Sequence, residues 1–181
     1  MSKELSLYDE IFSEVEGSVE ELKDGTDEDK LSALSLKFES KVPNLEQMCY
    51  IMEKVLLKKE SDATVYAGFQ RISRARNIWD RFRQIADNVD HVYVFGIDDD
   101  NLTPHPDIDF VYLDEEDRLS REWFLVINKP LGKSMMVAYD LDGFGVKEDE
   151  KSRNFKGAKT NNPRQVEKAS ELLEQFIENK L

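Results

Sequence analysis

The spacing of apolar residues predicts helices at both ends of the chain and strands in its middle. In the first sixty residues apolar side chains recur every three or four positions, a spacing typical of amphipathic helices. After Ser61 the apolar residues become β-branched and aromatic and form short runs, which are typical of strands. The predicted strands are 63–70, 91–97, 108–113, 122–128 and 134–140, with a helix over 74–87 and a hairpin over 128–133.

Capping residues indicate where two of the helices begin. Asn44 is the predicted N-cap of one helix and Asn162 that of the closing helix, because each is followed three residues later by a glutamine. Upstream of Asn44, a shorter helix is predicted from the spacing of Leu31, Leu34 and Phe38.

Helices at both ends of a run of adjacent strands predict an α+β fold. We expect a mostly antiparallel sheet of about five strands, flanked by helices, with a helical N-terminal segment. That segment, residues 1–30, is expected to be an extension, and residues 31–181 are expected to form the main domain.

The chain is strongly acidic. Of its 181 residues, 38 are Asp or Glu and 25 are Lys or Arg, for a net charge of −13. Such a charge repels phosphate backbones and anionic lipid surfaces, so we expect neither a nucleic acid nor a membrane as a partner. No apolar run is longer than five residues, and the N-terminus lacks the pattern of a signal peptide. We therefore expect a cytoplasmic protein.

Few side chains have the pattern of a catalytic or metal site. The single cysteine, Cys49, falls on the apolar face of its predicted helix, where a thiol is a small buried hydrophobe. Neither His91 nor His105 has a serine or cysteine partner in a known motif. The acidic run 98–101 lacks the glycine and glutamate of a calcium-binding loop, so we interpret it as a solvated turn. We expect no catalytic residue, no metal and no cofactor.

Four arginines flank the apolar face of the predicted helix over 74–87. On a helical wheel Arg74 and Arg81 fall along one edge of that face, and Arg76 and Arg83 fall along the other. The favoured interpretation is structural: their stems cover the core and their guanidinium groups pair with carboxylates. The alternative is that they bind an anionic ligand or an acidic partner.

From Leu31 onward the sequence resembles the DICT sensory domain, a family named for its association with diguanylate cyclases and two-component systems. The resemblance rests on the order of short stretches: SALS (32–35), AGFQ (67–70), RFRQIA (81–86), VYVFG (92–96), LSREWF (119–124) and RNFKGAKT (153–160). It implies a module that senses a ligand or signal and has no established catalytic residues. Residues 31–181 are then expected to be a stand-alone sensory domain that acts through a partner.

A sheet rich in aromatic residues and without a catalytic set favours a ligand cavity lined by strand side chains. The predicted pocket residues are aromatic residues and a few polar ones, namely Phe69, Gln70, Trp79, Tyr93, Phe95, Glu122, Trp123, Arg153 and Phe155. Periodicity alone does not distinguish rings that line a cavity from rings that fill a core.

Three functions remain open from the sequence. The first is a sensory, non-catalytic module that binds an unknown small molecule and passes the signal on by protein contact. The second is an acidic interaction adaptor without a ligand pocket. The third and least favoured is an enzyme that uses Glu122 and Asp140 across the last hairpin. For the first, the closing helix is expected to offer Phe176 and Leu181 to a signalling partner or to a second copy in a homodimer.

Overall fold

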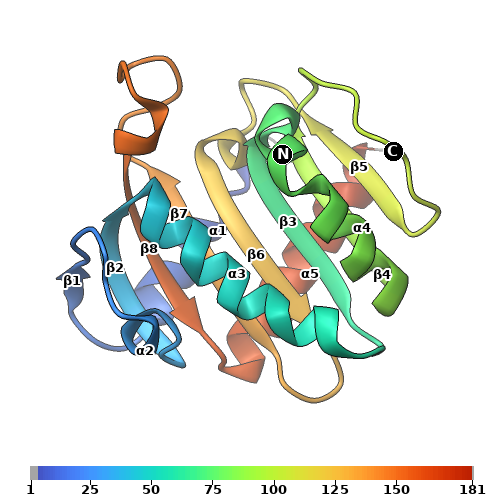
Figure 1. Ribbon diagram of the computed structural model, residues 1–181, viewed down its shortest axis with the longest axis horizontal. Coiled ribbons are helices and arrows are strands. Elements are labelled where there is room, and N and C mark those ends of the chain that lie inside the picture. Colours follow the sequence, from blue (N-terminus) through green and yellow to red (C-terminus); the bar gives the residue numbers. More distant parts are fainter. Residues whose placement is uncertain (1–3, 181) are drawn as a thin grey trace.

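The computed structural model describes residues 4–180, in which eight strands form one sheet in the order β1-β2-β8-β7-β6-β3-β4-β5 (Figure 1). The strands are β1 (Val19–Glu21), β2 (Ser35–Lys41), β3 (Thr64–Arg71), β4 (His91–Ile97), β5 (Ile108–Leu113), β6 (Glu122–Asn128), β7 (Ser134–Asp140) and β8 (Asn154–Thr160). The α-helices are α1 (Leu7–Ile11), α2 (Glu28–Leu31), α3 (Val42–Lys58), α4 (Trp79–Asn88) and α5 (Pro163–Lys180). Short 3₁₀ turns are η2 (Phe12–Glu14), η3 (Ile72–Ile78), η4 (Arg118–Arg121) and η5 (Glu150–Ser152).

The sheet is buried on both faces. Helices α3 and α4 cover one face, and α1 and α5 cover the other (Figure 1). Because side chains alternate along a strand, β3 to β8 each contribute to two separate cores, whereas β2 contributes only to the core under α3 and α4 and β1 has no buried residue. On β4, for example, Val92 and Val94 pack under α3 and α4, whereas Phe95 packs under α5. Within the described residues, no helix is long and apolar enough to cross a bilayer.

The α+β class is confirmed, but the expected sheet of about five mostly antiparallel strands is wrong. The sheet is larger and mixed, because β1 with β2, β3 with β4, and β4 with β5 are parallel pairs. The helical segment between β3 and β4 is a crossover, and a crossover of that length joins parallel neighbours. The last four predicted strands have the bounds of β4, β5, β6 and β7.

Two of the missing strands have patterns that conceal them. The predicted short helix through Leu31, Leu34 and Phe38 is wrong: α2 ends at Leu31, and β2 carries Phe38. Within β2, Leu36 and Phe38 are buried while Ser35 and Glu39 are exposed, so the burial there has the period of a strand. Strand β8 reads NFKGAKT and lacks the β-branched run that indicates a strand.

Helix starts follow the predicted caps in only one of two cases. The side chain of Asn162 accepts the backbone N–H groups of Arg164 and Gln165 at 3.0 and 3.4 Å, which confirms the cap of α5. Asn44 is not a cap, because α3 begins at Val42 and the buried Asn44 amide instead donates to the carbonyl of Lys23 at 2.8 Å.

The helix predicted over 74–87 is divided in the structure. Its first part is the 3₁₀ turn η3, and the α-helical part begins only at Trp79. Arg74 and Arg76 therefore lie in a 3₁₀ turn, in which successive side chains are about 120° apart and not the 100° that the helical wheel assumes.

Gly157 tests how tightly β8 is packed against β7. A Cβ built on Gly157 would lie 2.3 Å from the carbonyl oxygen of Val137, and a backbone atom cannot move aside as a flexible side chain can. We expect Gly157→Ala to lower the free energy of unfolding by about 3 kcal/mol in urea titrations. Gly145→Ala is the comparison: its Cβ would meet open space, and only its positive φ of 79° costs energy, roughly 1 kcal/mol. Equal losses in the two variants would contradict the packing explanation.

Candidate functional site

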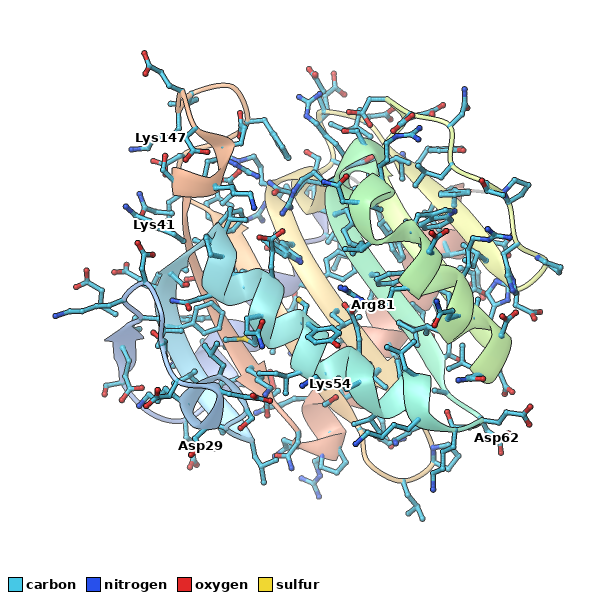
Figure 2. All side chains as sticks on the ribbon, viewed as in Figure 1. Asp29, Lys41, Lys54, Asp62, Arg81 and Lys147 are labelled. Carbon is cyan, nitrogen blue, oxygen red and sulfur yellow. The ribbon has the colours of Figure 1, made fainter. Side chains whose placement is uncertain are left out.

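A cavity of about 70 Å³ lies between α3 and α4, above β3 and β6. Helix α3 contributes Glu46, Cys49 and Glu53 to its wall, and the η3–α4 segment contributes the opposite wall. Figure 2 shows Arg81, which comes from α4, between the two helices. The residues that line the cavity are Glu46, Cys49, Glu53, Ala67, Phe69, Arg74, Asn77, Ile78, Arg81, Phe82, Trp123, Phe124 and Leu125.

The floor of the cavity is aromatic because two strands turn rings toward the α3–α4 side. Trp123 on β6 and Phe69 on β3 belong to the same buried cluster. Phe69 meets Phe82 of α4 edge to face at 5.3 Å, and Trp123 meets Phe155 of β8 edge to face at 5.7 Å. These ring contacts fix the floor in one arrangement.

Arg74 brings a positive charge to this floor. Its guanidinium lies 4.1 Å from the centre of the Trp123 ring, and its Nη1 donates to the carbonyl of Phe69 and to Oε1 of Gln70 at 3.4 and 3.2 Å. Burial, and next the nearby charge of Arg153, lower the pKa of Arg74 to about 10, so it remains a cation at neutral pH. Within residues 4–180, no carboxylate lies within ion-pair distance of Arg74.

The carboxylates of the cavity have partners of their own. Oε1 of Glu53 accepts from Nε of Arg81 at 2.7 Å, and Glu46 pairs with Lys151 at 3.7 Å. Burial raises the pKa of Glu53 to about 7, against the opposing effect of Arg81. Cys49 is buried as predicted, and burial raises the pKa of its thiol, so it is not a nucleophile at neutral pH.

Gln70 stands beside the cavity in an unusual backbone conformation. The register between β3 and β4 shifts between Gly68 and Arg71, which is a β-bulge, and Gln70 within it has a φ of 68°. A left-handed conformation is rare for a residue with a side chain and persists only where its surroundings hold it. Here the buried amide of Gln70 donates to Oδ2 of Asp140 at 3.0 Å, and its oxygen accepts from Nη1 of Arg153 at 3.1 Å.

A buried ion pair holds that arrangement. Nη1 of Arg153 and Oδ2 of Asp140 are 2.6 Å apart, and both side chains are almost fully inaccessible. Nε of Arg153 also pairs with Glu150 at 2.7 Å, and the ring of Phe144 lies 3.9 Å from its guanidinium. The pair thus joins the ends of β7 and β8 to the bulge of β3 and to the loop between β7 and η5.

The predicted pocket residues do not all lie at the cavity. Phe69 and Trp123 line the cavity; Gln70 and Arg153 form the adjoining polar cluster, and Phe155 supports Trp123. Trp79 does not line the cavity, because it packs on Phe82 and Phe110 and its N–H donates to the carbonyl of Thr103 at 2.7 Å.

Tyr93, Phe95 and Glu122 lie on the opposite face of the sheet, so the prediction that these side chains share one cavity with Phe69 and Trp123 is wrong. The alternation along β4 points Tyr93 and Phe95 toward α5. Oε1 of Glu122 accepts the backbone N–H of Tyr8 in α1 at 2.9 Å. Asp140, in contrast, belongs to the cluster on the α3 side, so the carboxylate pair expected for an enzyme does not converge.

The partner-contact prediction for the closing helix also needs correction. Phe176 is only 2% exposed, because α5 docks its apolar stripe on the sheet and the ring packs 6.3 Å from that of Phe95. Its ring is therefore part of the core. Leu181 lies outside the described residues.

Arg74 and Arg81 line the cavity, although the sequence does not predict them as pocket residues. The helical wheel placed them on one edge and Arg76 and Arg83 on the other, and this division is confirmed: the first pair lines the cavity, whereas Arg76 pairs with Asp100 outside it at 2.5 Å. The favoured structural interpretation holds for Arg76 and Arg81, which pair with carboxylates. Within the described part of the chain no cluster of three His, Cys, Asp or Glu side chains forms a metal-binding group.

Asp140→Asn tests the buried ion pair. Removing the carboxylate charge leaves the guanidinium of Arg153 buried beside a neutral group, and we expect a loss of about 3 kcal/mol in the free energy of unfolding. Asp109→Asn is the matched control, because Asp109 pairs with His91 at the surface and should change stability by no more than about 0.5 kcal/mol. Urea unfolding followed by circular dichroism measures both, and a loss in the first no larger than in the second would refute the assignment.

Glu122→Gln tests the buried carboxyl under α1. Burial raises the pKa of Glu122 from 4.5 to about 7, so the folded state favours the protonated form. This contribution to stability is full below about pH 4.5 and is lost as the pH rises through about 7. We therefore expect the variant to gain up to about 3 kcal/mol over the natural chain at pH 8, and little near pH 4. A stability difference that does not vary with pH would show that Glu122 titrates normally.

A protein-family model matches most of the chain. The sequence model of the family described as the sensory domain in diguanylate cyclases and two-component systems, DICT, matches residues 18–141. No curated protein matches the sequence. The matched region covers more than half of the chain and includes β1 to β7 with α3 and α4, and hence both walls and the floor of the cavity. The chain therefore belongs to the DICT family of sensory domains.

Proposed function

We propose that this chain is a non-catalytic sensory module that binds a small organic anion in the cavity between α3 and α4 and passes the signal on by contact with a second protein. The observation that carries the proposal is the guanidinium of Arg74, a cation that lines the cavity without an ion-pair partner among the described residues. A buried or half-buried cation is costly unless an anion balances it.

Glu46 and Asp140 raise the pKa of Arg74 electrostatically, but neither forms an ion pair with it, so they balance its charge only in part. Glu53 pairs with Arg81, and Glu46 pairs with Lys151. An anionic ligand group next to Arg74 would accept hydrogen bonds from a planar guanidinium that the Trp123 ring and Gln70 already orient. A carboxylate suits that geometry, because a guanidinium can donate two parallel hydrogen bonds to it.

The size and lining of the cavity limit what enters it. About 70 Å³ is room for roughly two water molecules or one small organic group. Phe69, Ile78 and Phe82 make part of the lining apolar. The ligand class is therefore a short or flat carboxylate, or the carboxylate end of a larger molecule.

A catalytic role is less well supported. Glu122 and Asp140, the carboxylates considered for an enzyme, act on opposite faces of the sheet. The thiol of Cys49 is buried and is not ionised at neutral pH. The remaining alternative, an adaptor with no ligand, is the negative outcome of the test below.

Benzoate is a suitable probe of the carboxylate end of a larger molecule, because a cavity of about 70 Å³ admits its carboxylate but not its whole ring. The two tryptophans report on its location. The ring of Trp123 lines the cavity, whereas the N–H of Trp79 donates to Thr103 outside it. In proton–nitrogen NMR spectra we expect benzoate to shift the Trp123 indole signal saturably and to leave the Trp79 signal in place. Arg74→Gln should weaken the fitted affinity about tenfold or more, because a charged hydrogen bond is lost.

Two controls separate anion binding from other effects. Arg76→Gln removes an arginine two residues away that pairs with Asp100 outside the cavity, and it should leave the benzoate affinity unchanged. Benzyl alcohol, which has the same ring without the charge, should bind the natural chain at least about tenfold more weakly. Equal affinities for benzoate and benzyl alcohol, or no saturable shift of the Trp123 signal, would refute the proposal.

A further inference from the structure

A second hollow, distinct from the ligand cavity, lies at the other end of α3. It is an apolar groove of about 180 Å³ between the C-terminal half of α3, the residues before β2, the β6–β7 hairpin and the end of β8. Ile51, Met52, Val55 and Leu56 of α3 form one side of it, and Leu34 lies on the rim.

The rim of this groove exposes large apolar side chains. Leu34 is 68% exposed and Val55 is 51% exposed, although the rest of the apolar stripe of α3 is buried. Leu131 at the tip of the β6–β7 hairpin is next to the groove residue Gly132 and is 85% exposed. A gathering of exposed apolar residues around a hollow is typical of a protein–protein contact site.

The charges in the groove have one sign. Its only charged lining residues among those described are Lys129 and Lys159, and no carboxylate lines it, in a chain that has 38 acidic residues against 25 basic ones. The ammonium of Lys159 is buried and donates to the carbonyl of Leu31 at 3.0 Å. Lys129 is half-buried and has no ion-pair partner within residues 4–180. The groove therefore combines apolar walls with unbalanced positive charge.

We infer that this groove binds an acidic amphipathic segment of a partner protein, with an apolar anchor in the hollow and carboxylates at Lys129. Opposite charges across an interface favour the correct partner, and an apolar anchor in a pocket supplies most of the binding energy. A second copy of this chain fits less well, because a two-fold contact would bring two positively charged grooves into one interface, and no carboxylate lines the groove to balance them.

This inference states which class of partner the proposed sensor contacts. It rests on the proposed function only for the claim that ligand binding is the input and the groove is the output. One helix serves both places: Glu46, Cys49 and Glu53 of α3 line the ligand cavity, and Ile51 and Val55 of the same helix line the groove. A ligand that shifts α3 would therefore alter the groove. The groove itself can be tested without any ligand.

The test uses a defined peptide with the full chain. A fluorescent amphipathic peptide, with leucines one helical turn apart and glutamates between them, is titrated with the protein and followed by fluorescence anisotropy. We expect saturable binding that Val55→Glu and Lys129→Glu each weaken about tenfold or more. Val146→Glu is the matched control, because Val146 is 68% exposed on the β7–η5 loop and lies outside the groove, and it should leave the affinity unchanged.

Peptide variants and the oligomeric state give the outcomes that would overturn the inference. A peptide with serines in place of the leucines, or lysines in place of the glutamates, should bind at least about tenfold more weakly. Equal affinity for the glutamate and lysine peptides would overturn the acidic partner. A concentration-dependent dimer that Val55→Glu dissociates in sedimentation would identify the occupant as a second copy instead. Benzoate is absent from these titrations. Failure of the peptide to bind would therefore not affect the benzoate result, and failure of benzoate to bind would not affect the peptide result.

Discussion

The buried ion pair between Arg153 and Asp140 is the contact on which the site depends. Removing two charges from water is costly, and the pair is stable only because further groups complete its hydrogen bonds. Gln70 supplies two of these bonds, and it reaches the pair only through the bulge that gives it a left-handed backbone. The same Gln70 oxygen accepts from Arg74 and so helps to hold that guanidinium over Trp123. The charge in the cavity is thus positioned by the ion pair beside it.

How far the sequence predicts this fold depends on how each strand is buried. Strands β4 to β7 carry β-branched and aromatic runs bounded by turn residues, and their bounds were predicted from that pattern. Strand β8 has Gly157 where β7 approaches too closely for a Cβ, and Lys159 where a buried ammonium meets the carbonyl of Leu31. Both residues are set by tertiary contacts, so a pattern of local propensity does not reveal the strand.

The sequence predicted only part of the site, and the reason is again the way in which the strands are buried. Rings on the strands were expected to line a cavity, and Phe69 and Trp123 do so. In a sheet covered on both faces, however, successive residues are all apolar, and no polar face shows which ring belongs to which core. Tyr93 and Phe95 were therefore grouped with rings on the other face. The sequence did not assign Arg74 to the cavity, because whether an arginine beside an apolar face has a carboxylate within reach depends on tertiary contacts.

Helix α3 is the element through which the two hollows can communicate. Glu53 binds Arg81 of α4 and faces the cavity, whereas Ile51 and Val55, two residues before and after it, face the groove. Two residues correspond to about 200° around a helix, so the groove residues lie nearly opposite Glu53. An anion that enters the cavity competes with Glu53 for Arg81, and it also favours the protonated form of Glu53, whose pKa burial has already raised to about 7. In the proposed sensor, either effect would weaken the contact between α3 and α4 at the cavity, and it would reach Ile51 and Val55 at the groove because the same helix carries them.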